Sequence, residues 1–167
     1  KLSNQKKLYC PELYKRISGN SDDVSRLPNW AEDKQILDDL NYICGYSKEA
    51  MIKSKYILLD TIPSESFNTI GQEKYEELFN ICVDVFEDDL IIKRHPRDSR
   101  EYKRVCKVYN YSEIPFEVIC ANSDIGNKVL ISASFSTVLM PKILFNFEPV
   151  VIMLHRITGR KLADEVK

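Results

Sequence analysis

Short apolar runs alternate with amphipathic helical patterns along most of this chain. Residues 56–60 and 90–93 have the composition of buried strands, and residues 72–86 repeat apolar side chains on one face of a helix. Further strands are expected over residues 104–109, 129–132 and 149–154, and further helices over residues 115–122, 136–145 and 158–167. Strands that alternate with helices pair in parallel, so the sequence predicts an α/β fold, a Rossmann-like parallel sheet with helices on both faces.

The first fifty residues are less regular. A short strand at residues 8–10, a helical turn at residues 12–17 and a helix that starts near Ala31 and ends before Gly45 are expected there. We therefore predict that residues 1–50 are a lead-in that packs on the domain, and that residues 51–167 form the Rossmann-like domain itself. Because the sequence starts at Lys1 and not at methionine, we expect it to be a piece of a longer protein.

The charge and the cysteines limit the kind of partner. The 167 residues have a formal net charge of −1, which gives no reason to expect nucleic-acid binding. The five cysteines include no C-x-x-C pair, which indicates reduced core residues in a cytoplasmic protein and neither a disulfide framework nor a zinc site.

No secretory leader is visible and no apolar run approaches the ~20 residues that cross a bilayer, so we expect at most peripheral association with the inner face of the cell membrane.

A histidine follows one of the expected strands closely. His95 comes directly before Pro96, which favours extended geometry at His95 and so presents the imidazole in a defined direction. Three basic residues surround it, namely Lys93, Arg94 and Arg97. Ligands of open α/β sheets bind beyond the carboxyl ends of the strands, so this segment suits a phosphate-bearing ligand. The alternative is a strand end followed by a solvated basic turn.

A hydroxyl-rich segment lies between the expected strand at residues 129–132 and the next helix. Ser136 and Thr137 stand at the start of that helix, where a side-chain hydroxyl can cap the free backbone N–H groups. Together with the positive end of the helix dipole, these groups form a ready anion site. An ordinary helix cap with polar neighbours is the simpler interpretation.

A carboxylate stands between these two segments. Pro115 opens a helix, and Glu117 lies in its first turn, where it could accept two hydrogen bonds from a ribose diol. Glutamate is also common at this position because it suits the helix dipole. Since His95 and Ser136 both follow expected strands, we expect the two to converge on one phosphate.

The order of these motifs resembles a known family. Lys93-x-His95-Pro96-Arg97, Pro115-Phe116-Glu117 and Ser136-Thr137 are similar to motifs of the bacterial sialyltransferases of glycosyltransferase family 52, which act on lipo-oligosaccharide and capsule and are related to the polysialyltransferases. The resemblance implies a GT-B enzyme with two Rossmann-like halves, of which this chain is the C-terminal, donor-binding half. It also implies CMP-sialic acid as the donor, transfer with inversion, and no metal or other cofactor. The implied partners are a glycan acceptor and the N-terminal half of the same enzyme, and a homodimer is left open.

The same resemblance implies roles for individual residues. His95 would be the general acid, Ser136 and Thr137 would hold the donor phosphate, and Glu117 would bind the ribose. The backbone around Lys93 and Arg94 would read the cytosine edge, and Arg97 would complete the donor site. The general base of the family is one of an acidic pair followed by glycine. Here that loop reads Ser64-Glu65-Ser66-Phe67, so Glu65 is the first candidate for the base and Asp60 is the second. Either acid could instead be a solvated loop residue or a helix cap.

Two other classes of function stay open. A different CMP-sugar transferase or a CDP-alcohol phosphotransferase would also suit a His-Pro motif followed by paired hydroxyls. A non-catalytic nucleotide-binding or assembly module is the third interpretation, and Ser66 and Phe67 in the place of the acidic motif favour it. We expect the chain by itself to bind CMP weakly and to transfer little, because the other half would supply the acceptor wall and exclude water.

Overall fold

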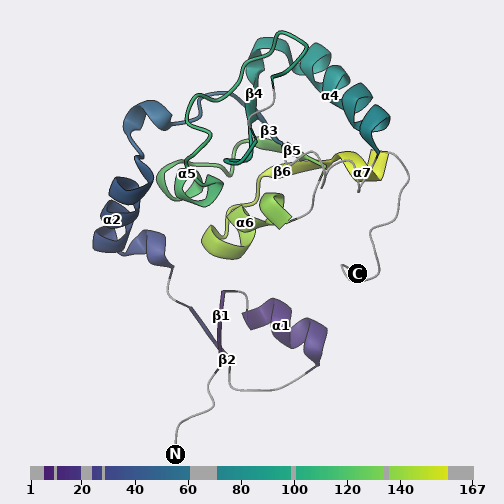
Figure 1. The fold of residues 1–167 in the computed structure, drawn as a ribbon. Helices are drawn as coiled ribbons and strands as arrows, with labels where there is room; N and C mark the ends of the chain where they lie inside the picture. The colour runs from purple at the N-terminus through teal and green to yellow at the C-terminus, as the bar shows by residue number, and fades with distance from the viewer. Residues whose placement is uncertain are drawn as a thin grey trace, which may run out of the picture.

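The computed structural model describes residues 6–9, 11–19, 24–27, 29–60, 71–98, 101–133 and 136–157. Its main feature is a parallel four-stranded sheet (Figure 1). The strands are β3 (Tyr56–Leu59), β4 (Leu90–Lys93), β5 (Val129–Ser132) and β6 (Val150–Met153). They lie side by side in the order β4-β3-β5-β6. The predicted α/β class with a parallel sheet is therefore confirmed.

This strand order creates a switch point in the sheet. The chain passes from β3 outward to β4 and then returns to β5 on the other side of β3. Connections on the two sides of β3 consequently diverge, which opens a crevice at the carboxyl ends of β3 and β5. Ser132, at the end of β5, is fully buried and donates a hydrogen bond of 3.1 Å to the carbonyl of Leu59, at the end of β3.

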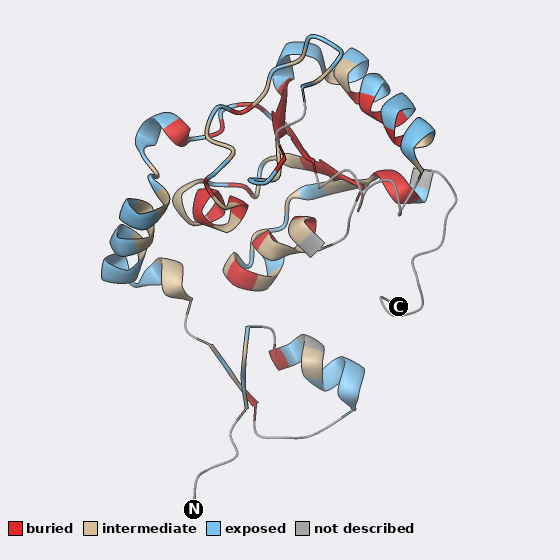
Figure 2. Ribbon diagram, in the orientation of Figure 1, coloured by how far each residue is buried: buried red, intermediate tan, exposed pale blue. Residues whose placement is uncertain are grey.

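Helices cover both faces of the sheet. The helix α4 (Gln72–Phe86) and the short α7 (Leu154–Ile157) cover one face, and α5 (Phe116–Asn122) and α6 (Ser136–Phe145) cover the other (Figure 1). Side chains alternate between the faces along each strand, so that Ile57 and Leu59 pack towards α5 while Leu58 packs towards α4. Because both faces are covered, β3, β4 and β5 are buried almost throughout, as Figure 2 shows for β3 and β4, whereas the edge strand β6 is only partly buried.

The helix α2 (Lys34–Cys44) lies at the edge of this body and ends before Gly45, as the sequence predicts, but it starts after Asp33 and not near Ala31. Asp33 caps it by accepting hydrogen bonds from the N–H groups of Gln35 and Ile36, and Gly45 adopts a left-handed conformation with φ of 66° at its other end. The helix has no buried residue, and Ile43 on its outer face is 75% exposed. Helical spacing of apolar residues therefore predicted the helix correctly but not its burial.

A reciprocal pair of amides attaches α2 to α5. Asn41 Nδ2 donates to Asn122 Oδ1 at 3.0 Å, and Asn122 Nδ2 donates to Asn41 Oδ1 at 2.7 Å. We expect Asn122→Ala to lower the free energy of unfolding by about 1–2 kcal/mol, because the two bonds to Asn41 and the bond from Asn122 Nδ2 to the carbonyl of Val118 are lost. Urea unfolding measures this, with the exposed Asn110→Ala as the control. Equal stability of the two variants would contradict the prediction.

A small unit precedes the sheet. Strands β1 (Lys6–Leu8) and β2 (Val24–Arg26) pair in parallel, and α1 (Pro11–Ser18) follows β1 (Figure 1). The strand and helix near the start were expected, but β2 was not. Three single 3₁₀ turns, Trp30–Glu32, Lys48–Ala50 and Glu87–Asp89, complete the regular structure of the described residues.

One predicted element differs from the structure, and another falls on residues that the structure does not describe. No strand forms over residues 104–109, where Val108 makes one isolated parallel bridge to Ile92. Val105 is 97% exposed, and Tyr109 turns into the core, where its hydroxyl donates to the carbonyl of Ala50, so the pairing with β4 stops after one residue. The closing helix predicted over residues 158–167 lies outside the described residues. Among the residues that the structure describes, no helix has the length and hydropathy to cross a bilayer.

Candidate functional site

A pocket of about 270 Å³ opens at the carboxyl ends of β3 and β4. The first turns of α5 and α6 complete its wall. Its polar lining consists of Asp60, Lys93, Arg94, His95, Glu117 and Thr137. All six are residues that the sequence singled out, and three separate motifs contribute to them.

The segment after β4 fixes the orientation of His95. A turn follows it, in which the N–H of Asp98 donates to the carbonyl of His95 at 2.9 Å and Pro96 occupies the first central position. The backbone N–H of Arg97 donates to Nδ1 of His95 at 3.2 Å. Because Nδ1 accepts a hydrogen bond, the proton of the neutral ring lies on Nε2, which is then the donor available to a ligand.

Lys93 is a buried cation at the base of this pocket, with 4% of its surface exposed. Its ammonium donates to the carbonyl of Ser112 at 2.7 Å and to that of Arg94 at 3.2 Å, and lies 5.9 Å from the ring centroid of Tyr109. Burial lowers its pKa to about 8, and the nearby charges of Glu113 and Glu117 oppose that decrease. The side chain of Lys93, and not only its backbone, is therefore part of the pocket wall.

The two arginines of this segment differ in position. Arg94 is half-buried and lines the pocket. Arg97 is exposed and is not among the lining residues, and its contribution is the backbone N–H that holds His95. The predicted donor-binding role of the Arg97 side chain therefore receives no support from its position.

The other two motifs lie at the starts of α5 and α6, and each contributes residues to the pocket wall. Glu117 is the second residue of α5, and Pro115 stands before that helix and lines the pocket as well. Thr137 is the second residue of α6, half-buried at the rim. Ser136 begins α6, but its side chain lies outside the part that the structure describes, as does Glu65.

Asp60 is held by two tyrosines that the sequence did not reveal. It is 4% exposed, and its carboxylate accepts one hydrogen bond from the hydroxyl of Tyr75 on α4 and another, at 2.6 Å, from Tyr102. Tyr75 was expected only as a core residue on the apolar face of its helix, and Tyr102 was not singled out. As a general base, Asp60 would have to exchange one of these bonds for a bond to the acceptor hydroxyl.

The pocket brings opposite charges together in a limited volume. The carboxylates of Asp60 and Glu117 face the cations of Lys93 and Arg94, with the imidazole of His95 beside them. Such an arrangement can hold a phosphate through the cations and helix N–H groups, and a diol through a carboxylate. Among the described residues, no group of three or more His, Cys, Asp or Glu side chains could hold a metal ion.

Comparison of the chain with known proteins adds no relative. No protein family, no curated protein and no solved structure matches it. The residues of the pocket are therefore the basis for inferring a function.

Proposed function

We propose that this chain is the donor-binding half of a GT-B sialyltransferase and that CMP-sialic acid occupies the pocket beside His95. One observation carries the proposal. His95, Glu117 and Thr137 are far apart along the sequence and come from three elements, yet they line one pocket at the carboxyl edge of the sheet. A site that binds and activates a nucleotide sugar requires an acid, a carboxylate that binds a diol, and a hydroxyl at the start of a helix.

The proposed reaction transfers the sugar with inversion and without a metal. As the bond between the sugar and the phosphate breaks, negative charge grows on the departing CMP. His95 Nε2 donates to that phosphate, and Lys93, with the N-terminal turn of α6, stabilises the charge without rearrangement. A carboxylate removes the proton from the acceptor hydroxyl, with Glu65 as the first candidate and Asp60 as the second.

The proposed setting follows from the same assignment. The partners are a glycan acceptor of lipo-oligosaccharide or capsule and the N-terminal half of the enzyme, with a second copy of the chain as a further candidate. The proposed location is the cytoplasm, with peripheral association at the inner face of the cell membrane.

A binding experiment tests the donor assignment. We expect CMP to shift the NMR signals of residues 93–97, Glu117 and Thr137, because residues 93–96, Glu117 and Thr137 line the pocket and the N–H of Arg97 holds His95. CDP-glycerol serves as the second probe. If CDP-glycerol is hydrolysed and CMP-sialic acid is not, the CDP-alcohol phosphotransferase replaces our proposal. If CMP binds but the chain combined with its N-terminal half converts neither donor, the non-catalytic nucleotide-binding module replaces it.

Thr137 provides a separate prediction. We expect Thr137→Val to weaken CMP binding about threefold to tenfold, because the isosteric change removes one hydroxyl that faces the pocket. Calorimetric titration with CMP measures the effect. Ser47→Ala, which removes an exposed hydroxyl outside the pocket lining, is the control, and an equal loss in both variants would contradict the assignment.

A further inference from the structure

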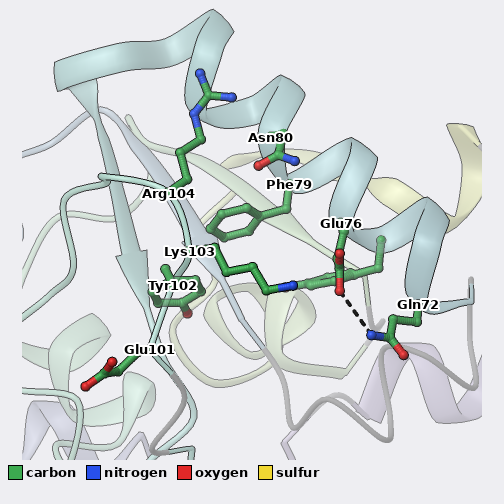
Figure 3. Close-up of a pocket in the computed structure, with 9 residues that line it drawn as sticks. Gln72, Glu76, Phe79, Asn80, Glu101, Tyr102, Lys103 and Arg104 are labelled. Carbon is green, nitrogen blue, oxygen red and sulfur yellow. Dashed lines mark hydrogen bonds between the residues drawn. The ribbon is translucent and has the colours of Figure 1, made fainter.

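A second pocket, of about 310 Å³, lies between α4 and the segment of residues 101–104. In Figure 3, Gln72, Glu76, Phe79 and Asn80 approach it from α4, and Glu101 to Arg104 approach it from the opposite side. The residues of α4 recur at spacings of three and four, so they form one face of the helix. None of them belongs to the pocket beside His95.

The second pocket has a rigid aromatic wall. The rings of Phe79 and Tyr102 are stacked, with their centroids 5.0 Å apart and their planes 6° from parallel. The Tyr75 ring adds to this wall, with its centroid 6.4 Å from that of Phe79. The hydroxyls of both tyrosines bond to Asp60, so the two rings are anchored from behind. The wall is therefore organised before any ligand arrives.

Polar groups of both hydrogen-bonding types surround the aromatic wall. Gln72 Nε2 donates to Glu76 Oε1 at 3.1 Å, which leaves the second oxygen of that carboxylate as a further acceptor (Figure 3). The amide of Asn80 both donates and accepts, and the ammonium of Lys103 only donates. The pocket can thus bind a ligand whose own polar groups, such as hydroxyls, both donate and accept hydrogen bonds.

The charges of this pocket do not favour an anion. Glu76 and Glu101 stand against Lys103 and Arg104, and Arg104 is bonded to Asp84, with one of its contacts at 3.1 Å. Positive charge is therefore not in excess, unlike at a phosphate site. A neutral ligand with many hydroxyl groups fits this balance better than a nucleotide.

We propose that this pocket is a saccharide-binding site that takes a neutral mono- or disaccharide. A pyranose ring has an apolar C–H face, which can lie against the aromatic wall, and hydroxyl groups at its edge, which can bond to the surrounding amides and carboxylates. The volume lies at the lower end of the range for small-molecule sites, which suits one or two sugar rings. This proposal stands without the donor assignment, because the two pockets share no lining residue.

NMR titration of the chain with lactose, a neutral disaccharide, tests the proposal. We expect saturable shifts at residues 72–80 and 101–104, with a dissociation constant of about 1–10 mM. Glu76→Ala should weaken lactose binding about tenfold, because a charged acceptor is lost. The matched control is Glu77→Ala, since Glu77 is the next residue of α4, is exposed, and bonds to Lys74 at 2.6 Å outside the pocket.

Three outcomes would overturn the saccharide site. They are the absence of saturable shifts up to about 50 mM lactose, an equal loss in Glu76→Ala and Glu77→Ala, and displacement of lactose from α4 by CMP. Thermal unfolding of both variants checks that each is folded. A chain that binds lactose at α4 but shows no CMP shift at residues 93–97 would overturn the donor assignment and leave the saccharide site intact.

Discussion

His95→Ala is expected to lower the rate of sialic acid transfer about 10²–10⁴-fold, the range that general acid catalysis contributes. The affinity for CMP should change much less, because in the proposed site Lys93 and the start of α6, which also line the pocket, would still hold the nucleotide. The physical reason is that charge on the departing phosphate grows only in the transition state, so the imidazole acts there and not in the ground state. Steady-state kinetics with the N-terminal half present, together with CMP titration, measure the two effects separately.

The control for this experiment is Asn110→Ala, at an exposed position outside the pocket. We also expect His95→Gln to recover part of the lost rate, because its amide can still donate a hydrogen bond. An unchanged rate in His95→Ala would remove the residue from the acid role. An equal loss of CMP affinity and of rate would make it a binding residue instead.

Lys93→Met is expected to weaken CMP binding about 10- to 100-fold without unfolding the protein. The ammonium is buried at the pocket, where a charge-assisted bond to phosphate is strong. Methionine has a similar length and no charge, so it removes the cation and leaves the packing largely intact. Calorimetric titration with CMP gives the affinity, and Lys53→Met, at an exposed position outside the pocket, is the control.

Lys93→Met should also change how the free energy of unfolding depends on pH. Because burial lowers the pKa of Lys93 to about 8 from 10.5, folding disfavours its charged form. Between these two values the unfolded chain binds more protons, so the contribution of Lys93 to stability increases as pH rises from about 8 towards 10.5. Over this pH range the contribution of Lys93 to the free energy of unfolding changes by at most about 3 kcal/mol.

Urea unfolding of the natural chain and of Lys93→Met between pH 7 and pH 10 measures this pH dependence. We expect Lys93→Met to be at least as stable as the natural chain at about pH 7, where the buried charge costs most, and to lose that advantage as pH rises. Subtracting the free energy of unfolding of one protein from that of the other cancels the contributions of groups that titrate in both. A natural chain that is more stable than the variant at about pH 7, or a difference in stability that does not change with pH, would contradict the prediction.

The local elements could be predicted because their patterns are complete within short stretches. The helix α4 has the predicted bounds, since apolar side chains repeat at helical spacing over its whole length. The strand β2 could not be predicted in this way. Its three residues, Val24–Arg26, contain one apolar side chain that is buried, and their extended conformation depends on pairing with β1.

The candidate site could be predicted only in part. His95, Glu117 and Thr137 were recognisable because each follows a strand or begins a helix, where side chains of an open sheet reach a ligand. The tyrosines that hold Asp60 were not recognisable. Tyr75 and Tyr102 lie 15 and 42 residues from Asp60 in the sequence, and no local pattern distinguishes them from core aromatics.

The sequence by itself determined the four strands of the main sheet, the helices α2, α4, α5 and α6, and the polar residues that stand at their ends, because periods of two and 3.6 residues depend only on neighbouring positions. Only the tertiary structure decided the order β4-β3-β5-β6, the inward path of the Lys93 side chain and the bonds of Asp60. These features depend on how distant segments pack across two faces of one sheet. That packing is a property of the assembled core and not of any single stretch of the chain.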